Sequence, residues 1–314
     1  MCEQSTVQNI KNQNPRAKKT RKKLVTQWIN TPLMLLNSPI KKYYERAYHC
    51  SSRLYQQGNK VHSRYCNSRT CISCNGIRTA AYIKHYGEEL LNLTEPYFLT
   101  LTAPTVQCYD SDTLRHFIDA REFIWRKMYK NAKENQKGVI ELKGMRAMEI
   151  TARPDDYYHI HFHFIIDGFQ NAVWVKNQWL KHYPNANEKA QAILPITSKG
   201  GLLEVFKYGT KFINKTKKKG KKGEIEVYEK VPAERTDLII QALQKKRLIS
   251  TFGGVRKMKD DDVNEMEVES QIDLDVAYDI WDWYNDLEDW FSSSGEKFSD
   301  FVPTKKFRKV FDEL

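Results

Sequence analysis

Three of the eight histidines in this chain occupy alternate positions of one short stretch, YYHIHFHFII (157–166). Because successive side chains of a β-strand point to opposite faces, His159, His161 and His163 are predicted to share one face. The apolar residues between them would face the core. Neutral imidazoles on a rigid strand are good ligands for a divalent metal ion. A polar strand face covered by a loop is the simpler alternative, but three alternating histidines favour a metal site.

A carboxylate is expected beside these histidines. The segment MRAMEITA (145–152) is predicted to be a strand, and the turn residues RPDDY follow it. A hairpin centred near Asp155 would place Glu149 opposite His161, close enough to complete the ligand set. Two imidazoles and one carboxylate leave open positions on an ion, as a catalytic metal requires. We therefore expect a divalent ion such as Mg²⁺ or Mn²⁺ at this site.

The segment LLEVFKYGTKFI (202–213) supplies a candidate nucleophile. On a helix, Glu204, Tyr208 and Lys211 would share one face. Lys207 and Lys211 flank the tyrosine with positive charge, which favours the phenolate over the phenol. A tyrosine beside a metal ion suits attack on a phosphodiester, with a covalent phosphotyrosine as the product. Taken alone, a tyrosine between lysines is usually an ordinary surface residue.

Four cysteines lie close together in the sequence: Cys50, Cys66, Cys71 and Cys74. Four thiolates suit a tetrahedral zinc ion, and a Cys-x-x-Cys pair can present two of them. The chain is large and has no apolar secretory segment at its start, so metal binding is favoured over disulfides. Either His49 or His62 could replace Cys50. Buried free cysteines are the alternative to a metal site.

The charge of the chain points to nucleic acid. Its net charge is +12, and residues 260–289 hold thirteen acidic and no basic side chains. The remaining residues carry 51 basic against 26 acidic side chains, a net charge of +25. Such an excess favours a polyanionic partner, although a solvated surface explains any single lysine run. Besides Lys207, the candidate DNA-binding residues lie in one predicted loop: Lys215, Lys217, Lys218, Lys219, Lys221 and Lys222.

The expected elements follow from periodicity and turn residues. Strands are predicted at 97–104, 145–152, 159–166 and 191–197, and helices at 79–91, 111–130, 172–183, 200–213 and 233–249. A helical stripe is predicted within 277–291, and a Lys-Gly loop at 214–223. No apolar run approaches the ~20 residues of a membrane helix, so we expect a cytoplasmic protein without membrane contact.

Taken together, these motifs resemble those of the HUH endonucleases, and most closely the rolling-circle replication initiators of small bacterial plasmids. The TLT strand (100–102) matches the first family motif, HFH (161–163) the second and YGTK (208–211) the third. The cysteine-rich element before TLT and the Gly-Gly pair at 253–254 are also similar to this branch. The resemblance covers roughly residues 45–257.

The resemblance implies an α+β fold with a central antiparallel sheet flanked by helices, an HUH endonuclease core of the RRM- or palm-like kind, and a small zinc-binding element. Together with the composition of the two ends, which lie outside the resemblance, it predicts four consecutive segments. Residues 1–44 would be a disordered basic arm and 45–92 the zinc-binding element. Residues 93–257 would form the catalytic domain and 258–314 an acidic, aromatic tail.

The same resemblance implies a reaction. The enzyme would nick one strand of a DNA origin, keep the 5′ phosphate on Tyr208 and leave a 3′ hydroxyl for a polymerase of the bacterial host. Lys211 occupies the lysine position of the tyrosine motif. Glu204 occupies the position from which this branch activates water, so hydrolytic termination is expected. Family members often read His-Pro-His where this chain has His159-Ile160-His161, so His159 remains a possible outer ligand.

Three other functions share some of these features. A transposase with the same catalytic core would differ in having flanking terminal repeats instead of a nearby replication origin. A conjugative relaxase usually places the tyrosine before the histidines, which this chain does not. A non-catalytic, zinc-dependent nucleic-acid-binding protein would explain the cysteines and the charge, but not the combination of Glu149, His161, His163 and Tyr208.

Overall fold

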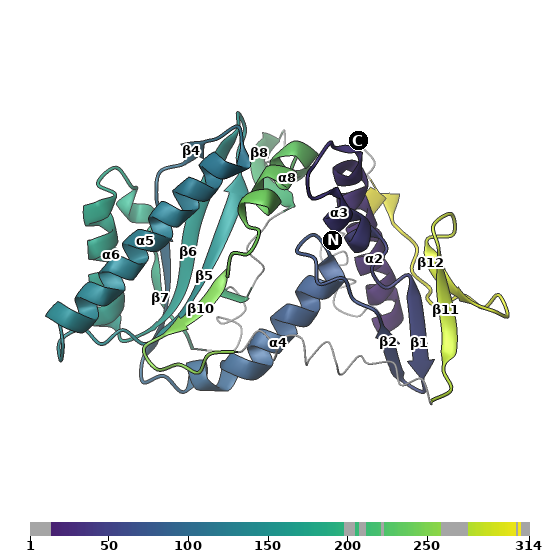
Figure 1. The fold of residues 1–314 in the computed structure, drawn as a ribbon, viewed down its shortest axis with the longest axis horizontal. Coiled ribbons are helices and arrows are strands. Elements are labelled where there is room, and N and C mark those ends of the chain that lie inside the picture. The colour runs from purple at the N-terminus through teal and green to yellow at the C-terminus, as the bar shows by residue number, and fades with distance from the viewer. Residues whose placement is uncertain are drawn as a thin grey trace. The chain divides into compact units, whose positions relative to one another are not determined.

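The computed structural model describes residues 14–197, 205–206, 212–220, 223–258, 276–305 and 307–308, with the backbone alone for 213–220 and 223–229. The chain divides into two compact units (Figure 1). Unit 1 combines Met1–Ile77, Lys215–Lys230 and Asp261–Leu314, and unit 2 combines Arg78–Asn214 and Val231–Asp260. Each unit is therefore assembled from separate stretches, and not from the four consecutive segments that we expected.

Unit 2 is built on a six-stranded sheet whose main strands run in the order β10-β5-β6-β3-β7, with β4 paired to β6 outside this path. Every pair in it is antiparallel. The strands are β3 (Pro96–Thr102), β4 (Val106–Gln107), β5 (Gly144–Ala152), β6 (Tyr157–Asp167), β7 (Ile193–Pro195) and β10 (Ile249–Phe252). The predicted α+β class, with antiparallel strands flanked by helices, is confirmed.

Three helices cover one face of this sheet: α5 (Ser111–Asn135), α6 (Phe169–His182) and α8 (Ala233–Ala242). The apolar residues of β6 meet them there, because Ile160, Phe162 and Phe164 are fully buried in the same hydrophobic cluster as residues of all three helices. The strand alternates, so its histidines lie on the opposite face. Figure 1 shows α5 running along the sheet.

The β5–β6 hairpin turns at Asp155 and Asp156, whose φ angles are +56° and +57°. Two consecutive left-handed residues suit the right-handed twist of a tight hairpin, and aspartate tolerates this region better than most side chains. The turn sets the register across the hairpin, in which Glu149 pairs with His161. The register predicted from the sequence is therefore confirmed.

Unit 1 holds helices α2 (Pro15–Leu35) and α3 (Lys41–Tyr48) and a four-stranded sheet in the order β12-β11-β1-β2. The strands are β1 (Arg53–Gln57), β2 (Lys60–Ser63), β11 (Asp279–Tyr284) and β12 (Asp289–Ser292). A separate pair joins β8 (Ile213–Gly220) to β9 (Gly223–Lys230). Helix α4 (Ile72–Leu91) begins in unit 1 and continues into unit 2, and the short helix η1 (Glu188–Ala190) precedes β7 in unit 2.

Two predictions for the ends of the chain are wrong. The basic segment predicted to be disordered forms α2 from Pro15 onward, and this helix buries polar residues as well as apolar ones. The predicted helix within 277–291 is instead the strand pair β11–β12. Its aromatic residues favour strands, and Trp281 and Trp290 bury one face of the sheet against Phe298.

The predicted Lys-Gly loop at 214–223 is also wrong for most of its length. Strand β8 extends to Gly220, so Lys215, Lys217, Lys218 and Lys219 lie on a strand paired with β9. A run of lysines can form a strand when the partner strand supplies the backbone hydrogen bonds. Lys221 and Lys222 lie outside the described residues.

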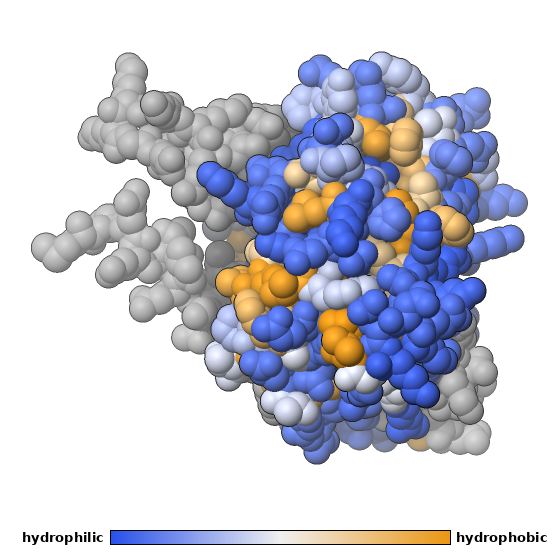
Figure 2. Space-filling view, turned by 90° about the vertical axis from the view of Figure 1, so that its left-hand side faces the viewer, coloured by the Kyte–Doolittle hydropathy of each residue, from blue (hydrophilic) through white to orange (hydrophobic). Residues whose placement is uncertain are grey.

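Within the described part of the chain, none of the helices combines the length and the apolar character needed to span a bilayer. On the side of the molecule drawn in Figure 2, hydrophilic side chains predominate among the described residues, and the hydrophobic ones form small separate groups. Small scattered groups are ordinary for a surface in contact with water.

Candidate metal centres

Glu149, His161 and His163 lie together on the face of the unit 2 sheet opposite α5, α6 and α8. Glu149 Oε2 is 3.5 Å from His161 Nε2 and 3.3 Å from His163 Nε2. The Glu149 side chain is 8% exposed and the His161 side chain 9%. This buried carboxylate and two imidazoles are the group that the sequence predicted, and it could hold a metal ion.

The donor set fits a divalent ion. Ligand atoms that share one ion with bonds of about 2.1 Å lie roughly 3–3.5 Å apart, and both measured separations fall within this range. The Nδ1 atom of His161 is buried and has no hydrogen-bond partner among the described residues. No described neighbour at Nδ1 fixes the tautomer, so the ring proton can sit on Nδ1 and leave the lone pair on Nε2, the atom that faces Glu149.

His163 is more closely held than His161. Its Nδ1 lies 3.3 Å from Thr100 Oγ1, and its ring stacks on Phe98 at 5.4 Å. A hydrogen bond at Nδ1 that uses the ring proton leaves the lone pair on Nε2, the atom that faces Glu149. The first threonine of the TLT motif thus contacts the metal group through a histidine.

The second threonine of that motif is fixed by residues that the sequence analysis missed. Thr102 pairs with His161 in the sheet. Its backbone N–H donates to Gln191 Oε1 (2.7 Å), and its hydroxyl accepts from Gln191 Nε2 (2.9 Å). Trp179 Nε1 donates to the Thr102 carbonyl at 2.7 Å. Gln191 is the first residue of a predicted strand with no motif around it, so nothing in the sequence singled it out.

His159 lies beside the metal group without joining it. Its ring centroid is 5.0 Å from that of His161, and the group of ligand atoms that lie within 4.8 Å of one another leaves it out. Burial, with smaller contributions from the neighbouring His161 and Arg153, lowers the pKa of His159 to about 4. The imidazole is therefore neutral at physiological pH and adds no charge beside the site.

The four cysteines of unit 1 converge as predicted. Their Sγ atoms all lie within 4.8 Å of one another, with Cys74 Sγ at 3.7 Å from Cys50 and 3.6 Å from Cys66. Sulfurs bound to one tetrahedral zinc at about 2.3 Å lie roughly 3.8 Å apart, whereas a disulfide needs about 2.05 Å. The structure thus groups Cys50 with Cys66, Cys71 and Cys74, and neither His49 nor His62 belongs to the group.

Backbone N–H groups support negative charge on these sulfurs. Cys66 N donates to Cys50 Sγ at 3.4 Å, Ser68 N to Cys66 Sγ at 3.3 Å and Cys74 N to Cys71 Sγ at 3.5 Å. The neighbouring thiols donate to Cys50 and lower its pKa, whereas the same contacts raise the pKa values of Cys66 and Cys74. A bound cation is therefore needed to hold all four sulfurs as thiolates, the form in which cysteine binds metals.

The structure does not describe the predicted nucleophile, Tyr208, or the residues predicted to act with it. Tyr208, Glu204, Lys207 and Lys211 lie outside the described residues. The residues described on either side of them are buried within unit 2. Phe206 stacks on Tyr82 at 6.3 Å and its carbonyl accepts from Thr79 Oγ1 at 3.2 Å, and the carbonyl of Phe212 accepts from Val231 N at 2.9 Å.

Comparison of the chain with models of protein families, with curated proteins and with solved structures finds no match.

Proposed function

We propose that this chain is a metal-dependent DNA-nicking enzyme of the HUH kind, acting as a rolling-circle replication initiator. One observation carries the proposal: Glu149 Oε2 lies within 3.5 Å of the Nε2 atoms of both His161 and His163 in the middle of an antiparallel sheet. A carboxylate and two imidazoles would fill only three positions on an ion, which suits a catalytic site more than a structural one.

A divalent ion held by Glu149, His161 and His163 would withdraw charge from a bound phosphodiester. Thr100 would keep the His163 ring in position, and Gln191 and Trp179 would fix the strand end that carries Thr102. The phenolate oxygen of Tyr208 would attack phosphorus, and the P–O3′ bond would break. The protein would then hold the 5′ phosphate as an ester, and the released O3′ would take up a proton.

The positive charge of Lys207 and Lys211 would favour the phenolate of Tyr208. Glu204 would take a proton from water in the step that ends a round of replication, hydrolysing the phosphotyrosine. Lysines of the 215–222 segment would bind the DNA backbone. The partners are thus an origin duplex or hairpin, its single-stranded nick site and host replication proteins.

The test is a nicking assay on supercoiled plasmid that carries the DNA flanking the coding sequence. We expect Mg²⁺- or Mn²⁺-dependent conversion to the open circle and a DNA adduct that survives denaturing gels. Tyr208→Phe should abolish both. Tyr109→Phe is the matched control, because Tyr109 is 73% exposed in unit 2. Adduct formation by Tyr208→Phe would show that another residue is the nucleophile.

At the cysteine group we propose a structural zinc ion bound by Cys50, Cys66, Cys71 and Cys74. The four sulfurs leave no position for a substrate, so this ion would stabilise unit 1 and take no part in the chemistry. Elemental analysis of freshly purified protein should give one zinc per chain. Zinc retained at full occupancy in Cys50→Ser would contradict the ligand set.

A non-catalytic, zinc-dependent nucleic-acid-binding protein is the second candidate. The four converging sulfurs and the surrounding basic residues favour it, because a complete zinc site requires no active tyrosine. The nicking assay separates the two functions. If wild-type protein binds origin DNA without any metal-dependent cleavage, the binding function stands and the nicking function does not. A transposase would nick as well, and only terminal repeats flanking its gene would separate it from an initiator.

A further inference from the structure

Lys23 of helix α2 is a buried cation next to the cysteine group. The residue is 2% exposed. Its Nζ donates to the carbonyl oxygens of Tyr48 and Cys50, both at 2.8 Å, and to Ser52 Oγ at 3.2 Å. An ammonium group has three N–H donors, and these three acceptors use all of them. The hydrogen bonding therefore suits the charged form of the side chain.

The Lys23 ammonium lacks a carboxylate partner within the described part of the chain. Among the residues that the structure describes, Lys23 forms no ion pair with Asp or Glu. Burial lowers the pKa of Lys23 to about 8, and negative charge on the sulfurs of Cys50, Cys71 and Cys66 acts in the opposite direction. A buried cation without a counter-charge is costly. Four neutral thiols offer little compensation, whereas a divalent ion with four thiolates carries a double negative charge.

Other residues of α2 approach the same group along one stripe of the helix. Lys19 Nζ donates to Tyr65 OH at 3.2 Å, next to Cys66 in the sequence. Lys22 Nζ would lie 2.9 Å from a Cβ atom at Gly76, so the bare glycine gives this lysine its place over the start of α4. Thr26 Oγ1 is 3.9 Å from Cys71 Sγ and accepts from Ile72 N at 3.0 Å.

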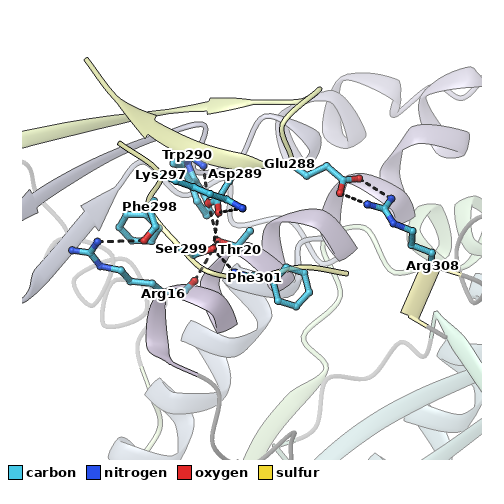
Figure 3. A network of polar contacts seen from close by, with 10 residues as sticks. All are labelled: Arg16, Thr20, Glu288, Asp289, Trp290, Lys297, Phe298, Ser299, Phe301 and Arg308. Carbon is cyan, nitrogen blue, oxygen red and sulfur yellow. Dashed lines mark hydrogen bonds and ion pairs between the residues drawn. The ribbon is translucent and has the colours of Figure 1, made fainter. Parts of the chain in front are cut away.

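A second stripe of α2 holds the C-terminal part of unit 1. Thr20 Oγ1 donates to the buried Asp289 at 3.1 Å, and Ser299 Oγ donates to the same carboxylate at 2.7 Å (Figure 3). Arg16 lies over the Phe298 ring at 4.8 Å and donates to the Phe298 carbonyl at 3.3 Å. Helix α2 thus connects the cysteine group with strands β11 and β12.

We propose that the Lys23 ammonium is the counter-charge of a metal–tetrathiolate centre formed by Cys50, Cys66, Cys71 and Cys74, and that it couples the docking of helix α2 to metal binding. Metal binding supplies the negative charge that the buried ammonium lacks. In return, the docked helix raises the affinity of the thiolates for the ion. This inference rests on the zinc assignment above and is independent of the nicking activity.

The first test compares Lys23→Met with Lys18→Met in the full chain. Methionine keeps much of the buried chain length without the charge, and Lys18 is an exposed residue of the same helix. Zinc affinity is measured by competition with a chromophoric chelator. Replacing an outer partner of a metal site typically weakens binding by about 10–100-fold. We expect this loss in Lys23→Met and wild-type affinity in Lys18→Met.

A purely structural role for Lys23 predicts a different pattern. Its three lost hydrogen bonds would then lower the thermal stability of the metal-free and zinc-loaded proteins equally, because affinity and stability are linked. Unchanged zinc affinity in Lys23→Met, with equal losses of stability in both forms, would overturn the inference. Co²⁺ substitution checks the premise, since cobalt bound by thiolates absorbs in the near ultraviolet. Wild-type protein without these bands would mean that the cysteine group binds no metal.

The second test follows α2 itself. Full-length protein is treated with trypsin before and after a zinc chelator, and the cuts are located by mass spectrometry. We expect slow cleavage within 15–35 in the zinc-loaded protein and at least tenfold faster cleavage after metal removal, reversed by added zinc. Exposed sites on α5 provide the internal control. Equal protection of α2 with and without metal would show that its docking does not depend on the ion.

Discussion

Thr100 and His163 are direct partners across strands β3 and β6, and Thr100 Oγ1 lies 3.3 Å from His163 Nδ1. Thr100, which the sequence analysis noted only as part of the TLT motif, therefore contacts the Glu149, His161 and His163 group indirectly, through the His163 ring. Its hydroxyl can hold the Nδ1 proton, so that Nε2 keeps its lone pair toward Glu149, where a metal ion could bind.

Replacing this threonine should weaken metal binding at the histidine site. Thr100→Val keeps the shape of the side chain and removes the hydroxyl. We expect the Kd for Mn²⁺, measured by calorimetry, to rise about 10-fold or more, in the range found for outer partners of metal-bound histidines. Thr100→Ser should bind as wild type does, and so should Thr105→Val at an exposed position. Equal binding by Thr100→Val would mean that the contact does not orient His163.

The two histidines should be needed for cleavage but not for binding DNA. Alanine at both His161 and His163 removes two of three ligands, so metal-dependent nicking should fall below detection. Phosphate contacts supply most of the affinity for DNA, so retention in a filter-binding assay should change by less than about threefold. Normal nicking by the double variant in the presence of EDTA would exclude this site from the chemistry.

Glu204 and Tyr208 should fail at different steps. Tyr208→Phe lacks the attacking oxygen and should not nick. Glu204→Ala should still nick and form the covalent adduct, but release should slow by about 10²–10⁴-fold, the usual contribution of a general base. Gel analysis of adduct lifetime measures this directly. If instead Glu204 only pairs with Lys207 or Lys211, a contact worth about a few tenths of a kcal/mol, both steps should stay near wild type.

Salt dependence should report on the lysine-rich segment. Replacing the six lysines between 215 and 222 with serine removes their phosphate contacts. If four of them neutralise phosphates, the slope of log K against log[salt] should flatten by roughly 3–4. Serines in place of the exposed Lys130, Lys133 and Lys137 make a matched control in unit 2. A slope equal to that of wild type would mean that β8 does not bind DNA.

The buried carboxylate in Figure 3 should contribute strongly to the stability of unit 1. Asp289 is 0% exposed and accepts hydrogen bonds from Thr20, Ser299 and the backbone N–H of Trp290. Asp289→Ala leaves these donors buried without an acceptor. The free energy of unfolding, measured in urea, should therefore decrease by about 2–4 kcal/mol. The exposed Asp286→Ala should change little. The partner Lys297 is 41% exposed, so its ion pair adds little.

The local sequence predicted the histidine–glutamate group and the cysteine group well, because the geometry of each depends mainly on residues that are close in the sequence. Strand alternation puts the histidines on one face, and the two-aspartate turn fixes Glu149 opposite His161. Cysteine spacing likewise predicted the sulfur group, except that only the fold could choose Cys50 over the nearby histidines. The roles of Gln191 and Trp179 were not predicted, because these residues lie 89 and 77 positions from Thr102 in the sequence and belong to no motif.

The predictions for the two ends of the chain were wrong because the structure of these segments depends on contacts with residues that are distant in the sequence. Lys23 alone reads as a solvated charge, and only the carbonyls of Tyr48 and Cys50 allow it to be buried. The segment around Trp281 has apolar residues at helical spacing, yet β1 provides it with a strand to pair with. Neither contact can be predicted from the local sequence. Such tertiary contacts override the helix or strand propensity of a segment.

The pairing of β1 with β11 has a consequence for how the protein is made. Arg53 and Asp282, partners across these strands, are 229 residues apart. At ribosomal rates of about 5–20 residues per second, the nascent chain waits roughly 10–50 s before β1 can meet β11. Unit 2 is complete by Asp260, so all of it is synthesised before β11 begins at Asp279. Truncated products of interrupted translation would therefore carry the histidine site but expose the unpaired edge of β1, which marks them for chaperones and proteases.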